Sequence, residues 1–203
     1  MRELSKEFLA TLTSGFLAEL TREVKKDSDL DLEIRENYIN LYYKGNSLLR
    51  LKRSTAGRYR VELHKKFLTG LPDMAVPPEI VDESMTKEFV KYIPAIKRNI
   101  QQYGAHSIET EYEQLFIRAN NYEKRVNSEY FVLDRQYVVG KQRFDLMGFC
   151  WRQPRAQYQT VKMCLVEVKY GLNPDIAGLN EQLERYYNVV KGRESDLAAI
   201  LFT

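Results

Sequence analysis

The chain has 203 residues, of which 44% are hydrophobic, 12% aromatic and 29% charged. This length can bury a sizeable core in one domain or two small ones, and the apolar fraction excludes an intrinsically disordered chain. The net charge is only +3, so bulk electrostatics does not indicate a nucleic-acid partner. We expect no membrane partner, because no apolar run approaches the roughly 20 residues that span a bilayer. Cys150 and Cys164 are too few for a disulfide scaffold, which indicates a reducing, cytoplasmic compartment.

The N-terminal half, residues 1–104, is predicted to contain a helix, an antiparallel meander and a connecting helix. Apolar residues recur every four positions over 3–26, as in an amphipathic helix. Alternating apolar and polar residues then predict four strands separated by turn signals. A proline-rich connector precedes the long helix, in which we expect Pro94 to cause a kink or a break. The predicted strands are 30–34, 38–43, 48–52 and 58–63, and the long helix is 79–103.

From residue 105 to 203 the predicted order is α-β-β-β-α-β. Ser107 is a good N-cap for the first helix, which ends near Ala119. The chain stops inside or just after the last strand, so we expect a fragment or a missing C-terminal part. The predicted apolar face of the first helix is Ile108, Tyr112, Leu115, Phe116 and Ala119. The predicted strands are 130–139, 143–151, 161–170 and 197–202, and the second helix is 174–191.

Two charged residues, Glu167 and Lys169, lie inside the apolar run Leu165-Val166-Glu167-Val168-Lys169-Tyr170. Side chains alternate between the faces of a strand, so both charges would point the same way. A buried charge is costly to desolvate, so such a pair is expected only where an interaction or a function compensates the cost. The run by itself leaves two explanations open: a chemical role, or a salt bridge at the end or wet edge of a strand.

A lone carboxylate, Asp145, stands among apolar residues of the preceding predicted strand. If the two strands are neighbours, Asp145 and Glu167 converge on one cation. Mg²⁺ takes oxygen ligands, commonly one or two carboxylates with waters and a substrate phosphate. Lys169 would then hold a phosphate oxygen or the attacking water. A capped strand end is the alternative for Asp145.

An aspartate on one strand and Glu-x-Lys on the next, in an α-β-β-β-α-β core, resembles the signature of the PD-(D/E)XK nuclease superfamily. Asp145 matches the aspartate and Glu167-Val168-Lys169 matches Glu-x-Lys. The resemblance covers about half of the chain and implies an α/β (α+β) fold with a restriction endonuclease-like core and a mixed sheet. It also implies Asp145 and Glu167 as metal ligands and Lys169 as a catalytic residue.

The second predicted helix carries Gln182 and Tyr186, which share a helix face at a spacing of i, i+4. This Gln-x-x-x-Tyr motif resembles the RecB-like branch of the superfamily, in which these residues bind substrate or shape the site. The alternative is that Tyr186 packs on the sheet while Gln182 is solvated.

The family also uses a glutamate of the first core helix, and the candidates are Glu109, Glu111 and Glu113. Glu109 and Glu111 flank the predicted apolar face on opposite sides, and Glu113 is further out. We select Glu109 as the catalytic candidate, followed by Glu111. A solvated helix charge is the alternative for each.

The sequence departs from the pattern of the superfamily at several positions. Gln142 stands three residues before Asp145, where many family members have glycine, although Gly140 lies five before. His106 precedes the first core helix, where RecB-like members often carry a histidine, but a helix cap or surface residue is the alternative. Two cysteines cannot hold the iron–sulfur cluster of some members. None of these departures removes the carboxylate pair or Lys169.

The N-terminal half adds basic residues interleaved with tyrosines between positions 30 and 70. They could follow a phosphate backbone and stack bases, or form the wet face of a sheet or a partner surface. The residues concerned are Arg35, Tyr38, Tyr42, Tyr43, Lys44, Arg50, Lys52, Arg53, Arg58, Tyr59 and Arg60.

The sequence therefore predicts a nuclease that depends on Mg²⁺ or Mn²⁺ and hydrolyses phosphodiester bonds in nucleic acid, with DNA as the expected substrate. A homodimer is an assembly that the family resemblance allows. The first alternative is an inactive protein of the same fold that binds nucleic acid or serves in an assembly. The second is a protein-interaction module in which Glu167 and Lys169 form only a salt bridge.

Overall fold

The computed structural model describes residues 3–55, 57–73, 75–105, 108–122, 128–150, 162–171 and 174–193. These residues form a mixed α+β protein with antiparallel sheets, and the chain divides into two units, residues 1–106 and 107–203. No helix in the described ranges is long and apolar enough to cross a membrane.

The first unit begins with two helices, α1 (Lys6–Thr13) and α2 (Ala18–Lys26), where the sequence predicts one. Thr11, Thr13 and Ser14 donate hydroxyl hydrogen bonds to carbonyls one turn earlier, a pattern that often bends helices. Gly15 then lies against Thr11, where a Cβ would come 2.8 Å from the Thr11 Cα. The prediction of a single helix over residues 3–26 is therefore wrong, because the chain turns at this glycine.

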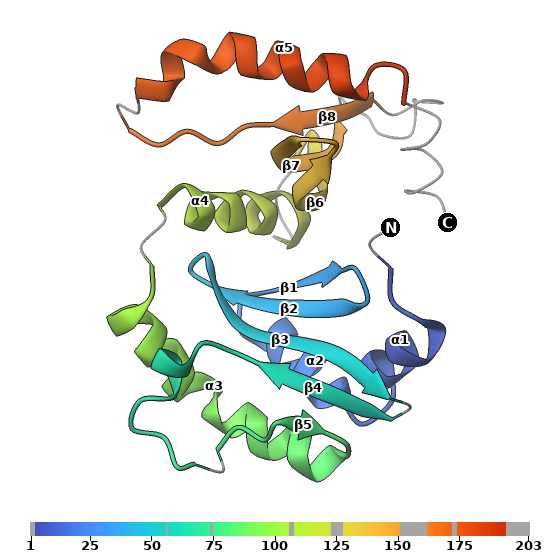
Figure 1. The fold of residues 1–203 in the computed structure, drawn as a ribbon, viewed down its shortest axis with the longest axis vertical. Coiled ribbons are helices and arrows are strands. Elements are labelled where there is room, and N and C mark those ends of the chain that lie inside the picture. The colour runs from blue at the N-terminus through green and yellow to red at the C-terminus, as the bar shows by residue number, and fades with distance from the viewer. Residues whose placement is uncertain are drawn as a thin grey trace. The chain divides into compact units, whose positions relative to one another are not determined.

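The first unit holds a five-stranded antiparallel sheet in the order β1-β2-β3-β4-β5. One apolar cluster joins this sheet to α1, α2 and the later helix α3, which makes a single core (Figure 1). The strands are β1 (Leu30–Arg35), β2 (Tyr38–Tyr43), β3 (Asn46–Thr55), β4 (Arg58–Glu62) and β5 (Glu79–Ile80). The first four occupy the predicted meander, while β5 takes residues that were expected to begin a helix.

Helix α3 (Glu83–Tyr103) begins after Asp82, whose carboxylate accepts a hydrogen bond from the Met85 amide at 2.8 Å. This cap explains why the helix starts later than predicted. Pro94 lies inside the helix, which continues through it. Pro94 therefore does not break the helix, and the expected kink stays a prediction.

The second unit has the order α4-β6-β7-β8-α5, and its strands pair antiparallel in the order β6-β7-β8. A π-helical turn, Arg118–Tyr122, extends α4, and a 3₁₀ turn, Pro174–Gly178, precedes α5. The last predicted strand, 197–202, and the predicted caps His106 and Ser107 lie outside the described residues, so the expected mixed sheet is not tested. The elements are α4 (Ile108–Ile117), β6 (Tyr130–Val139), β7 (Gln142–Cys150), β8 (Lys162–Val166) and α5 (Leu179–Val190).

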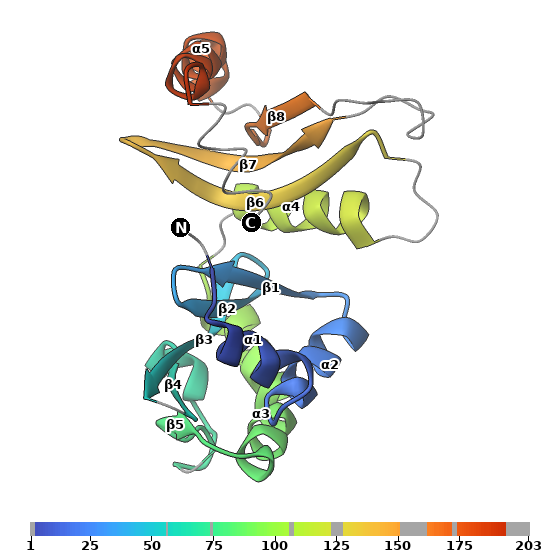
Figure 2. The ribbon, with the colours of Figure 1, turned by 90° about the vertical axis from the view of Figure 1, so that its right-hand side faces the viewer.

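The two helices of this unit lie on opposite sides of its sheet (Figure 2). On the α5 side, Tyr186 and Val190 pack with Phe144. On the α4 side, Ile117 packs with Leu146. The central strand β7 thus contributes to both apolar clusters, and it also carries Asp145.

The apolar face predicted for α4 is mostly wrong. Ile108, Tyr112 and Leu115 are exposed, whereas Glu113 and Ile117 are buried. Glu113 is buried because it forms an ion pair with Arg135 of β6, 3.5 Å from the Arg135 Nε. A long-range charge pair, rather than apolar periodicity alone, therefore orients this helix.

At Gly148 of β7 the backbone of the neighbouring strand leaves no room for a side chain. A Cβ at this position would lie 2.3 Å from the Phe131 carbonyl oxygen of β6, so Gly148→Ala must separate the two strands. We expect a loss of about 2–3 kcal/mol in the free energy of unfolding, measured by denaturant titration. Gly178→Ala is the control, because a Cβ there meets nothing within 4 Å. Equal stability of the two variants would contradict this packing.

Candidate active site

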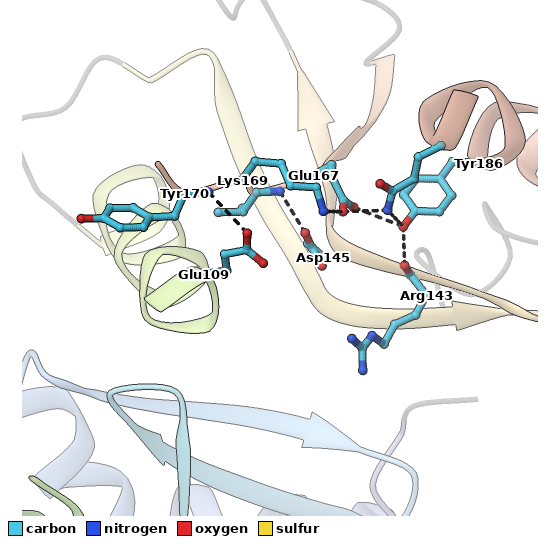
Figure 3. A network of polar contacts seen from close by, with 9 residues as sticks. Glu109, Arg143, Asp145, Glu167, Lys169, Tyr170 and Tyr186 are labelled. Carbon is cyan, nitrogen blue, oxygen red and sulfur yellow. Dashed lines mark hydrogen bonds and ion pairs between the residues drawn. The ribbon is translucent and has the colours of Figure 1, made fainter. Parts of the chain in front are cut away.

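The charged residues of the Glu-x-Lys run lie just beyond the end of β8, next to β7. The strand ends at Val166, so Glu167, Lys169 and Tyr170 follow it, and the predicted strand over 161–170 is too long. Figure 3 shows Asp145, Glu167 and Lys169 gathered between Glu109 and Tyr186. The structure therefore brings together the charged residues that the sequence analysis selected from three separate elements.

Asp145 holds the segment after β8 against β7. One of its carboxylate oxygens, Oδ2, accepts a hydrogen bond from the Val168 amide at 2.9 Å. This hydrogen bond lies directly beyond the β7–β8 ladder, in which the last residue pair is Leu146 with Val166. Asp145 thus fixes the backbone between Glu167 and Lys169.

The side chain of Glu167 is only 4% exposed and has polar partners at both oxygens. Its Oε1 accepts hydrogen bonds from Lys169 Nζ and from Gln182 Nε2, each at 2.7 Å. Its Oε2 lies 3.2 Å from the Tyr186 hydroxyl. Glu167 and Lys169 therefore share a side of the chain, as predicted, even though they are not in a regular strand.

Tyr186 combines packing with polar contact. It is buried, and its ring meets that of Phe144 edge-on at a centroid distance of 4.6 Å. Its hydroxyl accepts a hydrogen bond from Gln182 at 2.6 Å and lies 2.8 Å from the Arg143 carbonyl. The single hydroxyl hydrogen serves either this carbonyl or Glu167. The Gln-x-x-x-Tyr motif thus contacts Glu167 from α5, and the packing explanation for Tyr186 also holds.

The three helix glutamates have different positions. Glu109 Oε1 accepts a hydrogen bond from the Tyr170 amide at 3.4 Å, so this residue borders the cluster. Glu113 is buried beside Arg135 and also accepts from Gln136 Nε2 at 3.3 Å, so its expected outlying position is wrong. Within the described ranges, no contact joins Glu111 to the cluster.

The local environment shifts the protonation of these acids. Burial, together with the neighbouring negative charge of Glu167, raises the pKa of Asp145 to about 6, while the hydrogen bond from the Val168 amide opposes the shift. Burial likewise raises the pKa of Glu113 to about 7, with Arg135 opposing it and Asp145 adding to it. The hydrogen bond to Glu167 raises the pKa of Lys169, which keeps its ammonium charged at neutral pH.

Two carboxylates held close enough to repel each other form a donor pair for a hard cation. Mg²⁺ commonly uses one or two carboxylates and completes its shell with water and phosphate. No group of three or more metal-ligating side chains is present in the part of the chain that the structure describes. Asp145 and Glu167 are thus two carboxylate donors, and a cation bound to them would need further ligands from water or phosphate.

Sequence reasoning did not single out three residues in contact with the selected ones: Arg143, whose carbonyl lies beside the Tyr186 hydroxyl, Arg135, which pairs with Glu113, and Tyr170, whose amide donates to Glu109. A backbone acceptor leaves no signal in the side-chain pattern. Arg135 did carry a signal, because a charged residue at an interior position of the predicted strand 130–139 needs a buried partner.

Comparisons with known protein families, with curated proteins and with solved structures find no match to this chain. The resemblance to the PD-(D/E)XK superfamily therefore stays a prediction from the sequence motifs of this chain.

The raised pKa of Asp145 predicts a pH-dependent cost in stability. The folded-state value of about 6 lies above the unfolded value near 4, so the stability of the wild type falls as pH rises from about 4 to 6. Asp145→Asn removes this charge and keeps an oxygen for the Val168 amide. We expect the variant to be more stable than the wild type by about 1 kcal/mol at pH 8, after allowance for solvent screening, with a smaller difference at pH 4.

Thermal unfolding at a series of pH values in metal-free buffer measures this effect. Asp73→Asn, at an exposed aspartate, is the control. An Asp145→Asn variant that is less stable than the wild type at pH 8 would contradict the charge repulsion.

Proposed function

We propose that this protein is a metal-dependent nuclease that hydrolyses phosphodiester bonds in DNA, with a restriction endonuclease-like core over residues 105–203. The observation that carries the proposal is the convergence of Asp145, Glu167 and the Lys169 ammonium at the end of β8. Phosphodiester hydrolysis needs ligands for a divalent metal ion and a positive group that contacts the phosphate. The two carboxylates match the first need, and the Lys169 ammonium matches the second. The order α4-β6-β7-β8-α5 supports the same core.

In this proposal, Asp145 and Glu167 hold Mg²⁺ or Mn²⁺, and Glu109 is the adjacent carboxylate. When bound, the cation lowers the pKa of water and neutralises charge on the phosphate. Lys169 keeps its proton, so it acts as a hydrogen-bond donor that orients water or stabilises negative charge on the phosphate, not as a base. Gln182 and Tyr186 hold the Glu167 carboxylate in place from α5.

The second candidate is an inactive protein of the same fold that binds nucleic acid. The contacts to both carboxylate oxygens of Glu167 favour this inactive candidate, because these oxygens already have partners. The partners are Lys169, Gln182 and Tyr186. A cation bound at Oε1 of Glu167 would have to displace the Lys169 ammonium from that oxygen, a change that the inactive candidate does not require.

We place the protein in a reducing cytoplasm. Cys150 and Cys164 are free thiols. Burial raises the pKa of Cys164 to about 11, so this thiol stays protonated and unreactive at neutral pH.

The role of Lys169 gives a direct test of catalysis. We expect Lys169→Ala to lower Mg²⁺-dependent cleavage of linear and single-stranded DNA by at least about a hundredfold, the loss typical of one electrostatic donor. Lys162→Ala is the matched control, because Lys162 is an exposed lysine at the start of β8, the strand that precedes Lys169. Circular dichroism verifies that both variants fold. Equal cleavage by Lys169→Ala and the wild type would refute the mechanism.

Metal binding by the carboxylate pair is tested separately, without substrate. Calorimetric titration with Mn²⁺, and then Mg²⁺, should give binding to the wild type that Asp145→Asn abolishes, because one of the two carboxylates is lost. Asp73→Asn should bind as the wild type does. A folded wild type that binds neither ion, in the presence or absence of DNA, would favour the inactive candidate.

A further inference from the structure

Two exposed tyrosines stack at the border of the cluster. The rings of Tyr112 on α4 and Tyr170 after β8 have centroids 5.1 Å apart and planes inclined by 28°. Tyr112 is 45% exposed and Tyr170 is 47% exposed. Neither belongs to the apolar cluster between α4 and the sheet. The pair thus presents aromatic surface to solvent that the fold does not use for its core.

Helix α4 holds Tyr170 at two points. Glu109 accepts the hydrogen bond from the Tyr170 amide, and Tyr112 contacts the Tyr170 ring. Glu109 and Tyr112 are neighbours on the helix surface at a spacing of i, i+3. The ring is therefore positioned in advance, which reduces the entropy lost when a ligand binds to it.

The position of the stack relative to the charged residues is fixed by the chain. Tyr170 directly follows Lys169, and consecutive Cα atoms are about 3.8 Å apart. Figure 3 shows Tyr170 and Glu109 on one side of Lys169 and Asp145, with Tyr186 on the other. The aromatic pair thus begins one residue after Lys169 along the chain, while the Lys169 ammonium itself contacts Glu167.

We infer that Tyr112 and Tyr170 form a stacking platform for an unpaired nucleobase next to the phosphate held at Lys169. The inference depends on the proposed function and specifies its substrate as single-stranded or locally unpaired nucleic acid. A polynucleotide carries an anionic phosphate and a flat aromatic base on each unit, which matches a lysine followed by an exposed tyrosine stack. Bases stack on aromatic side chains with little sequence preference.

Exposed Ile108 and Leu115 continue the α4 surface on either side of Tyr112. These aliphatic residues would also suit a protein partner or a second copy of the chain. The charged neighbour Lys169 favours the nucleotide, since the centre of a protein interface is usually depleted of charge.

The experiment is fluorescence anisotropy with a labelled 12-nucleotide single-stranded DNA in EDTA, which prevents cleavage. We expect Tyr170→Ala to weaken binding about tenfold, whereas Tyr170→Phe, which keeps the ring, stays within about twofold of the wild type. The matched control is Tyr187→Ala, at a tyrosine of α5 that is 59% exposed. It should bind as the wild type does.

A second probe identifies the base. One abasic site is moved along the same DNA, and at one position it should weaken wild-type binding about tenfold and leave Tyr170→Ala unaffected. Circular dichroism verifies the fold, and Tyr170→Leu replaces Tyr170→Ala if the latter does not fold. Wild-type affinity for both Tyr170→Ala and Tyr170→Leu, or equal losses with abasic DNA in wild type and variant, would overturn the platform.

The outcomes separate the two proposals. If the protein cleaves DNA with Mg²⁺ but substitution of Tyr170 does not change DNA binding, only the stacking platform is overturned. If binding depends on the base but no cleavage occurs, only the nuclease proposal is overturned. A wild type that does not bind DNA overturns the platform. A fourth outcome has two parts: Ile108→Ser changes the sedimentation of the protein, and DNA binding does not depend on Tyr170. This outcome would assign the α4 surface to a protein contact and would overturn the platform.

Discussion

The buried carboxylate of Glu167 organises the second unit. A charge with so little exposure is tolerated only when its hydrogen-bonding capacity is met. Its partners come from two directions: Lys169 follows it along the chain, and Gln182 and Tyr186 reach it from α5. Tyr186 in turn contacts the Arg143 carbonyl of β7. Helix, strand end and central strand are thereby fixed to one another through one acidic group.

The same unit contains charge that is unfavourable for stability. Asp145 and Glu113 both have raised pKa values, mainly because of burial; the charge of Glu167 adds to the shift of Asp145, and the charge of Asp145 adds to that of Glu113. Arg135 compensates Glu113 in part, and Lys169 compensates Glu167. A fold selected only for stability would place apolar residues at such positions. Acids with raised pKa values that cluster in this way mark a candidate functional site.

The sequence predicted the elements better than their packing. The ranges of β2 and β6 were predicted correctly, because alternation of apolar and polar residues is a local signal. The spacing of Glu167 and Lys169 indicated their shared side, although the strand ends before them. The buried face of α4 was missed because it depends on the contact of Glu113 with Arg135, which no local pattern contains. The Tyr112–Tyr170 stack was missed for the same reason, since 58 positions separate the two residues along the chain.

The hydrogen bond from the Val168 amide to Asp145 has a further consequence for observing this site. Its acceptor is an acid, so the strength of the bond follows the charge on Asp145. Gain of a proton or coordination of a cation by that carboxylate withdraws electron density from the oxygen that Val168 contacts. The amide resonance of this one residue in a nitrogen–proton NMR spectrum therefore reports the ionic state of the site, from a backbone position that needs no substitution.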